Sequence, residues 1–455
     1  MTLPKSIFQQ KVLTLVAALA VFFFSAIARL AVTWPGLLDD DAARFERPDT
    51  AGYISEAGEL ATSGKITGTG RVPGFPVFAS LFIDGDSGEL RWRKLAVALA
   101  LTGAATSVLV FLAGSLKSLK VGAAAGLIHA WNLTAAANSP MLLSDTLFGF
   151  FAAVQFLLFM HLRIKKRHWC FVPMVGAAAM GVLIRPINLL WIFPALALLI
   201  LDFDGKLTWR RKLVYGAAGV LLFMLITFSW MFRNASLGAG FTPDTNTGAM
   251  HHQNGAMLMA QVNGTDFESE KARLIAEEES EFSDRERYPD EASREAWRLR
   301  RYREMVMAHP HIWLRQSATW RIFIPDAPTF LELLGVTKSD RGTMGVMAKY
   351  GFFAGVRHYF GGNWLALVLT SVVMIPVLLL YACALARIVC DICRIRERWY
   401  ELVAFLAFAE YYLLLPGAIT APRYQIPALP VLCVLSALFM MTERQGAPAE
   451  GEGQK

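Results

Sequence analysis

The chain alternates long apolar stretches with shorter polar connections over most of its length. The apolar stretches run to roughly 17–24 residues, close to the length that an α-helix needs to cross a bilayer. This pattern predicts an all-α protein, a polytopic bundle of about ten transmembrane helices. The predicted spans cover about residues 12–34, 93–114, 121–138, 146–162, 169–184, 187–201, 213–232, 363–386, 399–416 and 425–442.

Two longer polar segments, residues 35–92 and 233–362, separate these spans. They divide the chain into an N-terminal module (1–232) that includes the first loop, a long second loop, and C-terminal spans (363–442). A short tail follows (443–455). The second loop contains a charged stretch that cannot enter lipid, and then a mixture of apolar, aromatic and cationic residues. We expect short interfacial helices in both loops.

Basic residues collect in alternate connections between the spans, and this bias sets orientation in the membrane. It predicts that both termini are cytoplasmic and that the two long loops lie on the outer side. Arg91, Arg93 and Lys94 depart from the pattern. The connections that follow it carry Lys117, Lys120, Arg163, Lys165, Lys166, Arg167, Arg210, Arg211, Lys212, Arg394, Arg396 and Arg398.

Composition agrees with a membrane protein. Hydrophobic residues make up 55% of the chain and charged residues 18%, with a mean hydropathy of +0.41. A soluble globular chain is nearer one-quarter charged. The net charge of +7 does not indicate nucleic-acid binding, because the cationic residues mostly flank apolar stretches, where they anchor helices.

The first loop contains a short predicted helix over residues 50–62, ended by Gly64 in a C-terminal capping position. Asp49 and Tyr53 are four residues apart, so they share one face of this helix. Asp49 also stands where an aspartate commonly caps a helix N-terminus. From spacing alone, a capping role and a chemical role both remain open.

A combination of motifs resembles the GT-C glycosyltransferases. The first loop carries Pro-Asp-x-x-x-Tyr at residues 48–53 and Arg-x-Pro-Gly-Phe-Pro at 71–76, and three later segments match in order: 143–148, 184–186 and 423–427. The sequence is most similar to the bacterial branch that resembles protein O-mannosyltransferases, lipid A aminoarabinose transferases and lipopolysaccharide-core sugar transferases.

This resemblance implies a membrane enzyme that takes a sugar from a polyprenyl-phosphate carrier. The acceptor would be a lipid, a glycan or a protein of the cell envelope. In that family the acidic residue of the first loop is the catalytic carboxylate, which corresponds to Asp49, and Asp145 is the second acidic position. The expected substrate-binding residues are Tyr53, Arg71, Arg185 and Arg423. Arginine suits a leaving phosphate because it stays charged and offers a planar donor fork.

Each of these residues also has a plainer interpretation. Arg71 can be a solvated loop residue, and Arg185 and Arg423 can extend to lipid headgroups. Asp145 can cap the helix that follows it. The first loop also lacks an adjacent Asp-Glu pair, since Thr50 follows Asp49, which argues against protein O-mannosylation in particular.

No metal site or certain cofactor is predicted. The run Asp39-Asp40-Asp41 is typical of a solvated face, because three consecutive carboxylates do not converge on one ion. His251 and His252 are adjacent, and adjacent histidines are poor joint ligands without a further partner. A divalent cation therefore has no clear ligand set in the sequence.

A membrane transporter or lipid flippase is the alternative function. Such proteins place charged groups near the middle of several spans. Here Glu401 and Glu410 are the notable charges inside spans, and the other candidate residues lie at span ends on one side. We therefore expect a glycosyltransferase of the bacterial cytoplasmic (inner) membrane, acting at its outer face.

Overall fold

The computed structural model describes residues 5–201, 207–246, 250–318, 323, 325–336, 346, 350–417 and 421–441. Within these ranges the chain is helical, and the one extended pairing is an isolated bridge between Ile83 and Leu90. The prediction of an all-α fold is confirmed.

Six described helices are long and apolar enough to cross a membrane. Large apolar side chains on their outer faces are exposed, for example Ile27 at 67% and Leu225 at 71%. Extended apolar surface of this kind fits lipid, because a soluble protein buries it. The chain is an integral membrane protein. The six are α1 (Lys5–Leu38), α4 (Trp92–Ser115), α7 (Asp145–Lys165), α10 (Trp209–Ser236), α18 (Trp364–Cys393) and the segment Pro422–Met441, which comprises η7 (Pro422–Ala428) and α21 (Leu429–Met441).

The other four predicted spans correspond to shorter or more polar helices, so the expected length holds for six of the ten. Residues 121–138 are divided into α5 (Leu119–Trp131) and α6 (Leu133–Asn138), because Asn132 caps the second helix by accepting from the Ala135 N–H at 2.9 Å. Helix α8 (Phe171–Val182) has 12 residues and rises only about 18 Å, which is less than the roughly 30 Å thickness of a bilayer core. The remaining three predicted spans correspond to α8 (Phe171–Val182), to η3 (Pro186–Trp191) with α9 (Ile192–Ile200), and to α19 (Ile395–Phe405), η6 (Leu406–Glu410) and α20 (Tyr411–Leu414).

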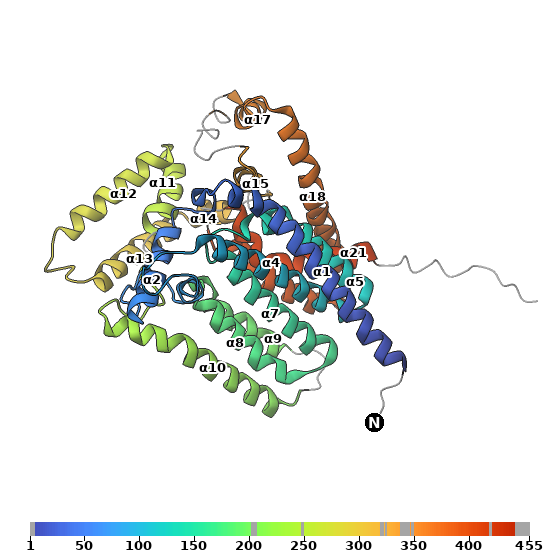
Figure 1. Ribbon diagram of the computed structural model, residues 1–455. Coiled ribbons are helices and arrows are strands. Elements are labelled where there is room, and N and C mark those ends of the chain that lie inside the picture. The colour runs from blue at the N-terminus through green and yellow to red at the C-terminus, as the bar shows by residue number, and fades with distance from the viewer. Residues whose placement is uncertain are drawn as a thin grey trace, which may run out of the picture.

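The membrane helices form one bundle (Figure 1). Helix α4 packs on α1, α5 and α7, α8 packs on α7 and α10, and α21 packs on α18 and α5. Most of the core lies between α7, α8 and the helices after residue 395, with Phe156, Trp191 and Phe408 at its centre.

A charge inside α1 was not noticed in the sequence. Arg29 is fully buried, and its guanidinium donates to the backbone oxygen of Ala130 at 3.2 Å and to the Ser25 hydroxyl. Ser25 contacts Ser107 at 2.8 Å, and Ser107 contacts His129 Nδ1 at 2.9 Å. These bonds tie α1 to α4 and α5. Arg29 is thus a third charge inside the predicted spans, in addition to Glu401 and Glu410, and it lies within a polar cluster.

The first loop folds onto the end of the bundle. It contains η1 (Ala42–Phe45), α2 (Thr50–Ser63) and α3 (Gly74–Ser80), and Gly64 adopts a left-handed conformation (φ 71°) as the predicted helix end requires. Phe45, Tyr53 and Phe75 pack with Leu95 and Leu99 of α4 into a separate apolar cluster. This cluster fixes the position of the loop.

The part of the second loop that forms α11, α12 and α13 stands to one side of the bundle in Figure 1. It has a small core of its own, built from Ala256, Leu258, Leu274 and Met305. Numerous ion pairs between arginines and glutamates line α12 and α13, among them Arg301 with Glu277 at 2.7 Å. The loop contains η4 (Met250–Asn254), α11 (Gly255–Asn263), α12 (Phe267–Phe282), α13 (Glu291–Ala308), α14 (Pro310–Ser317), α15 (Ala327–Leu333) and α17 (Phe352–Phe360).

Candidate active site

The residues singled out in the sequence meet at one end of the bundle. They come from the start of α2, the connection between α2 and α3, the start of α7, the turn after α8 and the start of η7. Asp49 pairs with Arg71 and Arg423, and Asp145 pairs with Arg185. Five charged side chains from segments far apart in the chain therefore form one cluster.

A glycine explains how two of these segments come so close. The Gly74 N–H donates to the Leu183 oxygen at 2.6 Å. A Cβ at this position would lie 2.6 Å from the Leu183 oxygen and 2.7 Å from the Ile184 side chain, so only glycine fits. This contact joins the segment that carries Arg71 to the turn that carries Arg185.

Asp49 precedes α2, but its carboxylate does not cap that helix. No side-chain cap hydrogen bond forms; instead Oδ1 accepts from Arg71 at 3.0 Å and Oδ2 from Arg423 at 3.4 Å. The Asp49 side chain is 41% exposed, whereas those of Arg71 and Arg423 are 20% and 18% exposed. The carboxylate thus sits in the capping position, held by two arginines and open on one side.

Asp145 is the first residue of α7 and is almost fully buried, with its side chain 3% exposed. It accepts a hydrogen bond from Arg185, whose side chain is 21% exposed. A carboxylate in the first turn also suits the positive end of the helix dipole. Arg185 lies in an extended turn just before Pro186. Its place beside Asp145 fits an inward-facing cation better than a headgroup anchor.

Tyr53 positions Arg71. The guanidinium carbon of Arg71 lies 4.8 Å from the centre of the Tyr53 ring, and the Tyr53 hydroxyl lies 3.2 Å from the Ser144 hydroxyl. Phe75 packs edge-on against Tyr53, with 5.1 Å between the two ring centres. Tyr53 is buried (7% exposed), and its contacts are with other side chains of the protein, so in this structure it serves to pack the site. Direct contact with a substrate stays a prediction.

Tyr424 was quoted in the sequence motif but given no role. Its ring lies between two site arginines, with the guanidinium carbons of Arg185 and Arg423 at 5.4 Å and 5.7 Å from its centre. A cation over an aromatic face is attracted by the ring quadrupole. The Arg423 Nε is buried and has no hydrogen-bond partner among the described residues. A donor of this kind is suited to an incoming anion.

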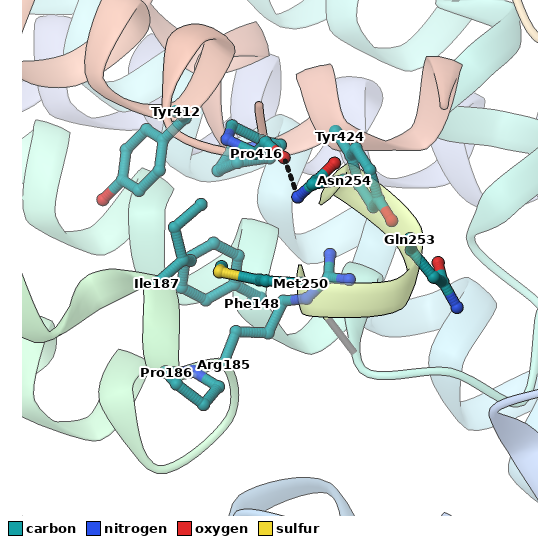
Figure 2. A pocket seen from close by; sticks show the side chains of 11 residues that line it. Phe148, Arg185, Pro186, Ile187, Met250, Gln253, Asn254, Tyr412, Pro416 and Tyr424 are labelled. Carbon is teal, nitrogen blue, oxygen red and sulfur yellow. Dashed lines mark hydrogen bonds between the residues drawn. The ribbon is translucent and has the colours of Figure 1, made fainter. Parts of the chain in front are cut away.

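A cavity of about 230 Å³ opens beside Arg185. Figure 2 shows Arg185, Tyr424 and Met250 facing it from three different segments. The second loop supplies one wall through η4, where the Asn254 side chain donates to the Pro416 oxygen at 3.4 Å. The cavity is lined by Phe148, Arg185, Pro186, Ile187, Met250, Gln253, Asn254, Tyr412, Pro416, Tyr424 and Pro427.

Other acidic residues from the sequence are placed elsewhere. Asp39 and Asp41 both pair with Arg44, at 2.6 Å and 3.1 Å, and Asp40 pairs with Arg93. The acidic run is therefore a set of surface ion pairs. His251 and His252 gain a partner that the sequence did not reveal, because Glu278 of α12 lies beside them.

Two buried carboxyl groups stand behind Arg71. Burial raises the pKa of Glu56 to about 7 against the opposing effect of Arg71. Burial, with a smaller contribution from Glu295, raises the pKa of Asp244 to about 7. The loop that carries Asp244 is bound to the first loop by the Thr245 N–H, which donates to the Thr69 oxygen at 2.9 Å. These carboxyls lie where the two loops meet.

The raised pKa values predict a pH effect on stability. Between about pH 4 and about pH 7 these carboxyls are ionised in the unfolded chain but still protonated in the folded chain. The free energy of unfolding therefore falls as the pH rises through this window, and it levels off above about pH 7. In thermal unfolding of the purified protein, the melting temperatures of Glu56→Gln and Asp244→Asn should rise relative to that of wild type as the pH increases over this window. The exposed Glu89→Gln control should run parallel to wild type. Variants that also run parallel would contradict the assignment.

Comparison with known proteins gives a distant structural relative. No family model matches the sequence, and no curated protein matches it. Among solved structures, the chain is similar to the Archaeoglobus fulgidus oligosaccharyltransferase, crystallised with a tethered acceptor peptide, at a TM-score of 0.50 and 13% identity. The match covers 93% of this chain.

The chain shares the fold of this oligosaccharyltransferase at a distant level. It spans about half the length of the archaeal protein, 49% of that chain. At this level of identity the similarity concerns the fold. The expected resemblance to membrane glycosyltransferases is supported only in its coarse form, as a distant likeness of fold.

Proposed function

We propose that this protein is a membrane glycosyltransferase that transfers a sugar from a polyprenyl-phosphate carrier to an envelope acceptor, which is a lipid, a glycan or a protein. The observation that carries the proposal is the cluster of Asp49 with Arg71 and Arg423, next to Asp145 with Arg185. A half-exposed carboxylate beside several arginines provides a proton acceptor and an anion site within reach of each other.

In the proposed reaction the acceptor hydroxyl attacks C1 of the sugar and passes its proton to Asp49. The bond between C1 and the phosphate oxygen breaks, and both electrons leave with the phosphate. A single displacement of this kind inverts the configuration at C1. The arginines stabilise the charge that develops on the leaving phosphate.

The ion pairs of Asp49 suggest how donor binding activates it. Arg71 and Arg423 hold the Asp49 carboxylate through one hydrogen bond each. A donor phosphate competes for the same guanidinium groups, in particular the Nε of Arg423 that lacks a partner among the described residues. Once these arginines turn to the phosphate, the Asp49 carboxylate is released from them and can contact the acceptor hydroxyl.

The transporter alternative receives little support from the buried charges in the described spans. Arg29 donates to a backbone carbonyl of α5 and to a serine of its own helix, and the first of these bonds fastens two helices together. The proposed location is the bacterial cytoplasmic membrane, with the site at its outer face, in keeping with the distribution of basic residues.

Mass spectrometry of cell-envelope lipids and glycans tests the proposal. Deleting this chain should remove one sugar from one class of envelope molecule, and wild-type protein should restore it. Asp49→Asn should not restore it. An unchanged envelope after deletion, or full restoration by Asp49→Asn, would count against the proposal.

A further inference from the structure

His251, His252 and Glu278 form a cluster in the second loop, outside the candidate active site. The two histidines belong to the π-helical turn η4, and Glu278 lies on α12. One ligand atom from each residue lies within 4.8 Å of the others. The partner of the histidines is not visible in the sequence, because Glu278 is distant in the chain and comes near them only when the protein folds.

The distances fit ligands around one ion better than hydrogen bonds. His251 Nδ1 lies 3.5 Å from Glu278 Oε2, and His252 Nδ1 lies 3.7 Å from the same oxygen. Both separations exceed the roughly 2.7–3.2 Å that is usual for an N–H···O bond. Ligands on a tetrahedral zinc ion, with bonds of about 2.1 Å, stand about 3.4 Å apart.

Burial makes the cluster unusual. His251 is 0% exposed, and neither of its ring nitrogens has a hydrogen-bond partner among the described residues. The Nδ1 of His252 and the Oε2 of Glu278 likewise lack one there. Buried polar atoms in native proteins nearly always have partners. Three such side chains directed at one point indicate a shared cation.

Neighbouring residues orient these ligands. Arg298 binds the other oxygen of Glu278, with Nε at 2.7 Å and Nη2 at 2.5 Å from Oε1, which leaves Oε2 directed at the histidines. Trp297 packs edge-on against the His251 ring at 5.1 Å. Outer contacts of this kind commonly hold metal ligands in place.

We propose that His251, His252 and Glu278 bind a divalent cation of the zinc class, with water as the fourth ligand. Two imidazole nitrogens favour zinc over magnesium or calcium, which prefer oxygen ligands. Three protein ligands and one open position form a common tetrahedral zinc arrangement.

The ion would fasten η4 to α12. Met250, Gln253 and Asn254 of the same turn line the cavity next to Arg185 (Figure 2). A metal on one side of η4 therefore fixes the cavity wall formed by its other side. This inference concerns the second loop and does not depend on the identity of the reaction.

Metal content of the full-length protein tests the site. The protein is purified in detergent through a tag without histidine, treated with a chelator, exposed to zinc and dialysed. One zinc ion per chain is expected for wild type and for the exposed control His311→Ala. His252→Ala and Glu278→Gln should retain almost none. Cobalt in place of zinc should give the strong visible absorption of a tetrahedral site in wild type.

Hydrogen–deuterium exchange provides a second measurement that does not rely on the buried histidine. Zinc should slow exchange over residues 250–263 and 267–282 in wild type and in His311→Ala, and should leave Glu278→Gln unchanged. Wild type that binds no zinc would overturn the proposal. Zinc retained equally by His252→Ala and Glu278→Gln would overturn it as well, since the ion would then lie elsewhere.

Discussion

Asp49→Asn is expected to lower sugar transfer by at least about 10²-fold, the lower range for loss of a general base. Asparagine has nearly the size of aspartate but neither its charge nor its ability to accept the hydroxyl proton. The variant should insert and fold at normal levels, because the Asp49 side chain makes no cap hydrogen bond to α2. Transfer is measured with purified protein, a polyprenyl-phosphate-linked sugar and an envelope lipid fraction.

The control for this experiment is Asp86→Asn, an exposed aspartate in the same loop that should transfer as wild type does. A purely structural role for Asp49, holding Arg71 and Arg423, makes the opposite forecast: Asp49→Asn stays active, while Asp49→Ala reduces the amount of folded protein. That outcome would leave Asp145 as the better candidate for the base.

Neutralising Arg185 is expected to have the second large effect. Arg185→Gln leaves the buried Asp145 without its partner, and breaking a buried pair commonly destabilises a protein by about 3–5 kcal/mol. The double variant Asp145→Asn/Arg185→Gln removes both charges and should recover normal amounts of folded protein. Transfer by the double variant should remain reduced by about 10²-fold, the range for loss of a donor that stabilises developing charge.

Arg185→Lys separates the two roles of this arginine. Lysine keeps a positive charge next to Asp145, so the folded amount should stay near wild type, but it lacks the planar fork that binds phosphate through two hydrogen bonds. Donor use should therefore fall while thermal stability changes little. Arg211→Gln, an exposed arginine before the membrane part of α10, is the matched control and should behave as wild type. Full transfer by the double variant would reduce Arg185 to a structural role.

Much of the fold could be predicted from the sequence because the signals are local. A run of apolar residues predicts a membrane helix wherever it packs, and the six long helices lie where such runs occur. The helix at Thr50–Ser63 and its end at Gly64 also follow from neighbouring residues. The single span predicted over residues 121–138 is two helices, because apolar composition alone does not reveal an internal cap such as Asn132.

For the candidate site, the residues could be predicted from the sequence but their contacts could not. Motifs identified Asp49, Arg71 and Arg423 as chemically suited residues, since residue type and position in a loop are visible in the sequence. Their pairing was not visible, because Asp49 and Arg423 are 374 residues apart and meet only when the first loop closes over the last helix.

Three features depended on tertiary structure altogether. Burial, which no local pattern reports, raises the pKa of Glu56 and Asp244 where the two loops meet. Helix packing encloses Arg29 in a polar cluster. The approach of α12 to η4 gives His251 and His252 a carboxylate partner. Apolar runs and turns act over a few residues, so the sequence determined the helices and their chemistry-bearing ends. Charge pairs and desolvation act through space, so only the packed bundle decided which of those ends meet.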